Sequence, residues 1–255
     1  MILETNNLVK NFGGVKALQS ASISVAKASI TGLIGPNGAG KTTLFNAISG
    51  FLPIDSGSIS FDGYEIGKLN PSKIVKLGLT RTFQTSSGFP SMSVWENIMT
   101  SGSNEYLESP FKVLRPSKLL REKELKVSNK VRTMLKRFDL KELLDKPLGD
   151  ISIVEMRFVE IIRQLMTSPK ILLMDEPASG FGPDDLDRLR EIIKWIQDEG
   201  ITILLIEHNL PFVLNIVDYV YVLSNGRVIG DGLPSEIVKN KAVIENYIGK
   251  QNVSH

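Results

Sequence analysis

The sequence predicts an α/β protein in which a parallel sheet is covered by helices on both faces. From Pro169 onward, short apolar runs alternate with longer amphipathic ones, as in KILLMD, then DDLDRLREIIKWIQD, then ITILLIEH, then YVYVLSNGRVIG. In addition, the apolar run SITGLIG leads directly into a glycine-rich loop and a segment with helical spacing. Buried strands that alternate with helices are typical of parallel sheets, because each crossover helix covers one face of the sheet.

The remaining elements follow in chain order. Before about Gln84, β-rich runs dominate: KTTLFNAIS has helical spacing, but GSISFDGYEI alternates apolar and polar residues as a half-exposed strand does. The pattern then becomes helical, with VWENIMTSG, the charged run SKLLREKELKVSNKVRTMLKRF and finally VEMRFVEIIRQLM. We expect a single domain made of a core (1–90 and 167–230), a helical subdomain (91–166) and a C-terminal helical tail (231–255).

Composition sets outer limits on function. The 255 residues include 30 basic and 28 acidic side chains, a net charge of +2 that argues neither for nor against nucleic acid. The chain has no cysteine, which excludes disulfides and Cys-ligated zinc. The N-terminus lacks the pattern of a secretory signal, and no apolar run approaches the ~20 residues that span a bilayer. We expect a protein that is soluble by itself.

The charged run before Phe138 contains eight Lys or Arg and two Glu. A nucleic-acid patch is one interpretation of this charge. However, Val127, Val131, Met134 and Phe138 form an apolar stripe at helical spacing, which is typical of a helix that packs on one face and is solvated on the other. We therefore expect a helix with a solvated basic face and no nucleic-acid partner.

The segment GPNGAGKTT carries a phosphate-binding pattern, Gly-x4-Gly-Lys-[Ser/Thr], whose alternative is an ordinary glycine turn. Glycines let backbone N–H groups converge on phosphate oxygens, and the dipole of the following helix adds to this attraction. The lysine reaches the β and γ phosphates, and the hydroxyl that follows ligates magnesium. We expect a nucleotide and Mg²⁺ at this loop. Its binding residues are Gly35, Asn37, Gly38, Gly40, Lys41, Thr42 and Thr43.

Polar side chains also follow two of the predicted strands. Asp175 and Glu176 come at the end of KILLMD, and His208 follows ITILLIE. Ligands of such sheets lie at the carboxyl ends of the strands. There Asp175 can hold magnesium, and Glu176 can orient the attacking water and accept its proton. The alternatives are helix capping for the two carboxylates and a structural role for the histidine.

GPNGAGKTT, RTFQ, ILLMDEP and LLIEH, in this order, resemble the ATPase subunits of ATP-binding cassette (ABC) transporters over almost the whole chain. The resemblance implies a P-loop NTPase core of the RecA-like type, an N-terminal antiparallel β subdomain and an inserted helical subdomain. It implies that Gln84 contacts magnesium and the γ-phosphate and that His208 is the switch histidine. It also implies that Phe12 stacks on adenine, although a core aromatic residue would look the same.

Further segments resemble a subgroup, the importers of branched-chain amino acids, urea and amides together with the lipopolysaccharide-transport ATPase. These segments are RTFQTSSGFPSMSVWENI, LLIEHNL and AVIENYIG. The resemblance implies that FPSMSVWENI lies where a helix of the membrane partner docks, which would suit an exposed Phe89 and Trp95. The alternative is that Trp95 packs within the helical subdomain.

The signature motif is where this chain departs from the family. Counting back from Asp175 at the family's spacing places Leu-Ser-Gly-Gly-Gln at residues 151–155, which here read ISIVE. Ser152 could still donate to a γ-phosphate, but Val154 replaces a glycine and Glu155 adds a negative charge beside an anionic ligand. Another departure is Gly182, where relatives usually have Asn or Asp. We expect an impaired signature.

These patterns predict an ATP-hydrolysing subunit of a transporter, with a permease, a second ATPase subunit and a solute-binding protein as partners. We expect it at the cytoplasmic face of the inner membrane, importing a branched-chain amino acid, urea or a related polar solute. Two cassettes of this family pair head to tail, so the impaired signature would serve the partner's nucleotide. This favours an asymmetric heterodimer, with a homodimer as the alternative. A lipopolysaccharide or lipid exporter, a non-transport ABC protein and a regulatory module that binds without hydrolysis remain alternative functions.

Overall fold

A computed structural model describes residues 1–82, 88–102, 118–240 and 243 of the protein. The chain forms two compact units. Met1–Arg81 together with Lys170–His255 make up the first, which we call the sheet unit, and Thr82–Pro169 make up the second, the helical unit. Gln84 lies outside the described residues.

The sheet unit contains a six-stranded sheet in the order β10-β9-β3-β8-β7-β6. Its strands are β3 (Ile30–Ile34), β6 (Leu79–Arg81), β7 (Ile171–Asp175), β8 (Thr202–Ile206), β9 (Tyr219–Ser224) and β10 (Arg227–Gly232). Every pair except β9–β10 is parallel. All residues of β3, β7 and β8 are buried, as expected for central strands covered on both faces. The predicted α/β class with a parallel sheet is confirmed.

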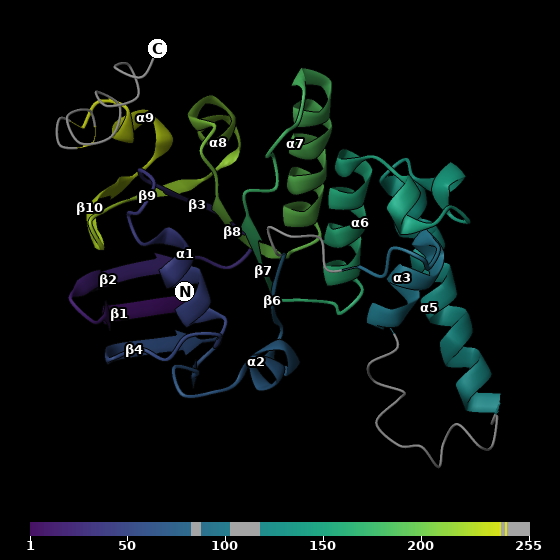
Figure 1. The fold of residues 1–255 in the computed structure, drawn as a ribbon, viewed down its shortest axis with the longest axis horizontal. Coiled ribbons are helices and arrows are strands. Elements are labelled where there is room, and N and C mark those ends of the chain that lie inside the picture. The colour runs from purple at the N-terminus through teal and green to yellow at the C-terminus, as the bar shows by residue number, and fades with distance from the viewer. Residues whose placement is uncertain (83–87, 103–117, 241–242, 244–255) are drawn as a thin grey trace. The chain divides into compact units, whose positions relative to one another are not determined.

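The two faces of this sheet have different covers (Figure 1). On one face lie α7 (Pro183–Asp198) and α8 (Leu210–Ile216), and on the other lie α1 (Lys41–Ile48) and a second, antiparallel sheet in the order β2-β1-β4-β5. The strands of the second sheet are β1 (Leu3–Phe12), β2 (Val15–Val25), β4 (Ser56–Phe61) and β5 (Tyr64–Glu65). A short helix, α2 (Pro71–Leu77), precedes β6.

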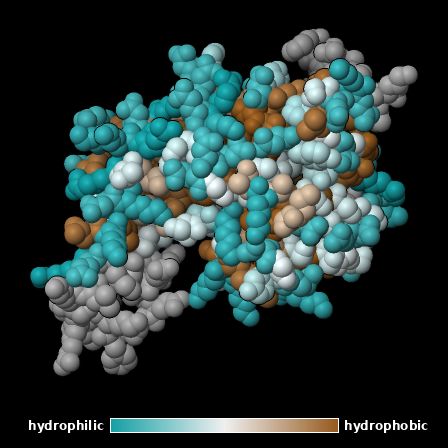
Figure 2. Space-filling model, turned by 180° about the vertical axis from the view of Figure 1, so that it is seen from behind, coloured by the Kyte–Doolittle hydropathy of each residue, from teal (hydrophilic) through white to brown (hydrophobic). Residues whose placement is uncertain are grey.

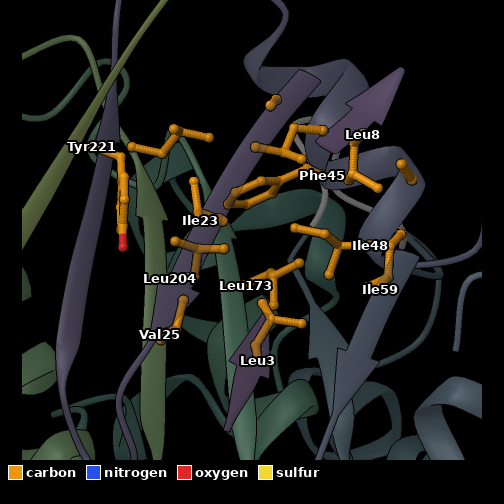
Figure 3. Packing of buried hydrophobic residues seen from close by; sticks show 14 of the residues in the cluster. Leu3, Leu8, Ile23, Val25, Phe45, Ile48, Ile59, Leu173, Leu204 and Tyr221 are labelled. Atoms are coloured by element: carbon orange, nitrogen blue, oxygen red, sulfur yellow. The ribbon is translucent and has the colours of Figure 1, made fainter. Parts of the chain in front are cut away.

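The core of the sheet unit lies between α1 and the two sheets. Figure 3 shows side chains from both sheets converging on Phe45 of α1, among them Leu3 and Ile23 from the antiparallel sheet and Leu173 and Leu204 from the parallel sheet. Phe45 is fully buried. This packing fixes the position of α1 and therefore of the glycine-rich loop that leads into it.

Two segments form antiparallel hairpins that the sequence analysis did not predict. The run YVYVLSNGRVIG, expected within the parallel alternation, folds into β9 and an antiparallel β10, and GSISFDGYEI divides into β4 and β5. Each turn holds an Asn-Gly or Asp-Gly pair at positive φ: Asn225 (47°) with Gly226 (73°), and Asp62 (47°) with Gly63 (84°). Such pairs favour the two-residue hairpin turn, because both residues tolerate the left-handed region.

The helical unit is built from α3 (Val94–Gly102), α5 (Lys118–Arg137) and α6 (Ile153–Leu165), with short 3₁₀ turns at Lys141–Leu143 and Leu148–Asp150. The predicted apolar stripe of α5 packs inward: Val131 and Phe138 are fully buried, and the rings of Phe138 and Phe158 meet edge to face with centroids 6.2 Å apart.

Two basic residues of α5, the half-buried Lys130 and the exposed Arg132, also make contacts within the helical unit. Lys130 Nζ donates to Leu165 O (3.0 Å) and Met166 O (3.3 Å) at the end of α6. These carbonyls have no partner within the helix, and a cation there is also favoured by the helix dipole. The guanidinium of Arg132 lies 5.1 Å from the centre of the Trp95 ring, a cation–π contact within the helical unit.

Beyond β10 the structure describes α9 (Pro234–Ile237), whereas most of the predicted helical tail lies outside the described residues. None of the described helices is long and apolar enough to cross a bilayer. The face drawn in Figure 2 is mostly hydrophilic, with hydrophobic residues in several separate groups.

Candidate functional site

The glycine-rich loop connects β3 to α1. Gly40 is the N-cap of α1 and provides no side-chain cap, and the first turn of the helix contains no acidic residue. The first N–H groups of an α-helix have no partner within the helix, so this end is suited to an anion. Lys41 Nζ donates to Gly35 O (2.7 Å) and Pro36 O (3.0 Å), which holds the lysine across the loop. Burial lowers the pKa of Lys41, and the charges of Glu176 and Asp175 oppose this shift.

Two glycines of this loop are also required by packing. A Cβ on Gly35 would stand 2.0 Å from Leu223 O, and a Cβ on Gly40 would stand 2.5 Å from Ala17 O. Both contacts are with backbone, which cannot move aside as a side-chain end can. Gly40 also has φ +104°, in the region that L side chains rarely adopt. The two glycines of the predicted phosphate loop are therefore also needed for the loop to pack against the backbone of β9 and β2.

The other predicted loop residues lie around this turn. Asn37, Gly38 and Thr42 are exposed, and Thr43 is half-buried. Thr42 is the second residue of α1, so its hydroxyl is at the end of the helix that faces the loop. These positions leave Asn37, Gly38 and Thr42 accessible to a ligand.

Asp175 ends β7 as a buried carboxylate, only 3% exposed. Its Oδ2 accepts a hydrogen bond from Arg81 Nη2 at 2.7 Å. The same guanidinium donates to Asn46 Oδ1 (2.6 Å) and Ser49 Oγ (3.3 Å), and lies 5.5 Å from the centre of the Phe45 ring. Arg81 therefore ties the end of β7 to α1. Arg81 was part of the RTFQ segment but was given no role, because β6 is only Leu-Thr-Arg and shows no apolar run in the sequence.

Glu176 follows directly and has a left-handed backbone, with φ 50°. This conformation is uncommon for a residue other than glycine. Its N–H donates to Ile206 O at the end of β8 (2.9 Å). His208 Nε2 lies 2.7 Å from Glu176 Oε1. The predicted catalytic pair, 32 residues apart in the chain, is thus in contact.

The remaining predicted residues are more dispersed. Phe12 ends β1 and is 49% exposed, with Lys10 Nζ 5.6 Å from its ring centre. An exposed ring is available for stacking, so the alternative of a core aromatic does not hold. Phe89 is also exposed, and Trp95 is half-buried. Ser152 belongs to the helical unit.

The altered signature forms the start of α6. Ser152 is the N-cap: its Oγ accepts from Glu155 N (3.2 Å), and Glu155 Oε2 accepts from Ser152 N (2.7 Å). This is a capping box, a motif that accepts either Glu or Gln at its last position. Glu155 therefore takes the helix-capping role that the family's Gln could fill, and Ile153 beside it is 70% exposed.

Gly182, the other departure from the family pattern, is the N-cap of α7 and makes no side-chain cap. Asn or Asp, the residues usual in relatives, would cap this helix.

The donors present fit magnesium when it arrives with a nucleotide. In the described ranges, no three His, Cys, Asp or Glu side chains gather as a metal site by themselves. The Asp175 carboxylate and the Thr42 hydroxyl are hard oxygen donors. Magnesium in proteins is typically held by one or two carboxylates together with substrate phosphates rather than by an all-protein cage.

A glycine-rich loop between β3 and α1, two carboxylates at the end of β7 and a histidine after β8 that contacts one of them define the class of P-loop nucleotide-binding proteins. The chain belongs to the ABC transporter family, whose model matches residues 18–179, and whose cassettes hydrolyse ATP to power transport.

Relatives match the chain from end to end. The chain is 41% identical to the probable branched-chain amino acid transport ATP-binding protein LivG of Methanocaldococcus jannaschii, over 98% of each chain. It is 36% identical to the high-affinity branched-chain amino acid transport ATP-binding protein BraF of Pseudomonas aeruginosa, also over 98% of each. Among solved structures, an ATP-binding cassette of an ABC transporter in its ADP conformation superposes with a TM-score of 0.84 and 40% identity, covering 97% of this chain and 98% of the other.

Proposed function

We propose that the protein is the ATP-hydrolysing subunit of an importer for branched-chain amino acids or a related small polar solute such as urea. The observation that carries this proposal is the end-to-end similarity to LivG and BraF, whose names specify branched-chain amino acid transport. These names favour import over a lipopolysaccharide exporter and over a non-transport ABC protein.

In this proposal the nucleotide lies on the loop before α1. Lys41 exchanges its bonds with the loop carbonyls for the β and γ phosphates, and Phe12 stacks on adenine. Thr42, Asp175 and Gln84 would hold magnesium, which neutralises charge that develops on the phosphates. Burial strengthens the attraction between Lys41 and a phosphate, because the effective dielectric constant is low there.

Hydrolysis is assigned to the pair at the ends of β7 and β8. Glu176 orients the attacking water and accepts its proton, and His208 holds that carboxylate through the 2.7 Å contact. Gln84 completes the group at the γ-phosphate.

The partners follow from the same relationship. A permease would provide the membrane passage, a solute-binding protein would deliver the solute, and this chain would bind peripherally at the cytoplasmic face of the inner membrane. Phe89, exposed in the helical unit, is a suitable contact for the permease.

A second ATPase subunit would complete the nucleotide sites, and we propose that it is a different chain. The motif at residues 151–155 has Val154 in place of a glycine and uses Glu155 to cap α6. It would serve the nucleotide on the partner's loop poorly, whereas Lys41, Asp175 and Glu176 are intact. The site on this chain would therefore need a partner with an unaltered signature.

The transport proposal is tested by purifying the chain from its native membrane with its bound partners and reconstituting the complex into liposomes. ATP-dependent uptake of radiolabelled leucine or urea is the expected result. The complex carrying Lys41→Ala should take up neither, because the cation at the phosphates is lost. ATP-driven release of lipid, or co-purification with no membrane protein, would contradict import.

A further inference from the structure

Glu207 is a buried carboxylate that the site described above does not use. It follows β8 directly, precedes His208 and is 4% exposed. Ala178 N–H donates to its Oε1 (2.6 Å), and His208 N–H donates to its Oε2 (3.1 Å). The N–H of Asn209 is a further donor to this carboxylate. Both oxygens thus receive backbone N–H groups, which suits the ionised form.

These donors come from the two loops that carry the catalytic pair. Ala178 lies two residues after Glu176 in the loop between β7 and α7, and His208 lies in the loop between β8 and α8. Asn209 in turn caps α8, accepting from Phe212 N at 3.1 Å. One side chain therefore joins segments that are 29 residues apart in sequence.

Burying a carboxylate such as that of Glu207 is unfavourable, so its presence here needs a structural reason. Burial raises the pKa of the Glu207 carboxyl, and the nearby charge of Glu176 adds to the increase, whereas the backbone N–H bonds oppose it. A buried ionised group costs several kcal/mol unless hydrogen bonds compensate it. An apolar residue would fill the same space without this cost, but it could not accept N–H groups from both loops.

We infer that Glu207 is a positioning residue that holds the backbone on both sides of the Glu176–His208 contact and thereby fixes its geometry. The meaning of this contact for catalysis rests on the proposed function, but the positioning itself does not. Misplacing a catalytic group by about 1 Å can cost on the order of a hundredfold in rate.

The chain offers a direct test because it has two histidines, His208 and His255. In a His255→Ala background, the imidazole ¹⁵N signals of the full-length chain report His208 alone. With Nε2 in contact with Glu176 Oε1, one tautomer should dominate at a pH where the imidazole is neutral. Glu176→Ala removes the acceptor and provides the reference spectrum for a released imidazole.

Glu207→Gln is the informative variant, because it keeps the size but presents an NH₂ group to a backbone N–H. We expect its His208 signals to move toward the Glu176→Ala reference. Glu160→Gln is the matched control: Glu160 is 3% exposed but lies in the helical unit, and its replacement should leave the His208 signals in place. His208 signals unchanged in Glu207→Gln would overturn the inference.

The rate of ATP hydrolysis by the assembled complex distinguishes a failure of this inference from a failure of the proposed function. Glu207→Gln should lower kcat roughly ten- to a hundredfold, with little change in the KM for ATP, because the loop at Lys41 is untouched. If the signals move but kcat is unchanged, the positioning role stands and the catalytic role of the contact fails.

Wild-type protein provides a measurement that does not depend on the variant folding. The Ala178 amide, bonded to Glu207, should exchange its hydrogen slowly, and rapid exchange at Ala178 would contradict the positioning role.

Discussion

Arg81 Nη2 lies 2.7 Å from Asp175 Oδ2, and both side chains are more than nine-tenths buried. The two residues are 94 positions apart in sequence, and Asn46 of α1 and Ser49, which caps the end of that helix, accept further hydrogen bonds from the same guanidinium. Arg81 thus balances the charge of the carboxylate that we assign to magnesium. Because a buried carboxylate without a partner is unfavourable, this pair links the stability of the fold to the integrity of the site.

Arg81→Met should therefore destabilise the chain by roughly 3–5 kcal/mol, since it leaves Asp175 buried without its cation. Urea denaturation measures the difference. Adding Asp175→Asn should recover part of the loss, because the second change removes the stranded charge. Lys27→Met, which breaks an exposed pair with Asp62, is the control and should leave the midpoint close to that of the wild type. An equally small effect of Arg81→Met would show that the buried pair does not matter for stability.

Glu176→Gln should preserve ATP binding and lower turnover by about 10²–10⁴-fold in the assembled complex, because an amide cannot accept the proton of the water. Calorimetry measures binding and phosphate release measures turnover. Glu199→Gln, an exposed change at the end of α7, should alter neither. Wild-type turnover in Glu176→Gln would remove this residue from the mechanism.

The heterodimer proposal predicts unequal sites. Glu176→Gln should stop nearly all hydrolysis by the complex, whereas the same change at the partner's equivalent carboxylate should do much less. Val154→Gly with Glu155→Gln should raise turnover at the partner's site if that carboxylate is intact. The capping box survives this double change, since Gln can replace Glu there. Equal losses from the two carboxylate variants, or a rapidly hydrolysing homodimer, would rule the proposal out.

Substitutions at the N-caps of α6 and α7 should change the stability of the chain in opposite directions. Ser152→Ala should cost about 1 kcal/mol, because it removes the acceptor for the Glu155 N–H at the start of α6. Gly182→Asn should instead add a few tenths of a kcal/mol by capping α7, where a Cβ has room. Chemical denaturation measures both changes. A stabilising Ser152→Ala would be inconsistent with the capping box.

The hydrogen bond of Tyr219 should contribute less to the stability of the folded chain at alkaline pH. The hydroxyl donates to Asp231 Oδ2 (2.6 Å), which raises the pKa of Tyr219 to about 12. The folded chain thus keeps a proton that the unfolded chain releases near pH 10, so this contribution is lost as the pH rises from about 10 to 12. Ultraviolet titration of tyrosinate, with Tyr219→Phe to assign the signal, measures the pKa. Asp231→Asn should lower it, and an unchanged value would contradict the role of this bond.

The sequence by itself determined the family, the α/β class and the local elements of the fold. Apolar runs such as ILLMD and TILLI became fully buried strands, and the loop from Gly35 to Gly40 joined a strand to a helix. These features could be predicted because the periodicity of apolar residues and the backbone freedom of glycine act over a few neighbouring positions. The assignments of catalytic and ligand-binding roles from the same motifs stay predictions.

Only the tertiary structure decided which distant side chains meet. Arg81 reaches Asp175, and Glu207 reaches the N–H of Ala178, through folding that brings the ends of separate strands to one edge of the sheet. No local pattern in RTFQ or LLIEH specifies these contacts. The same holds for Glu155, whose charge suggested repulsion of a phosphate but whose geometry makes it a helix cap. The physical reason is that the role of a buried polar side chain depends on its hydrogen-bond partners. The fold brings those partners from residues that are remote in sequence.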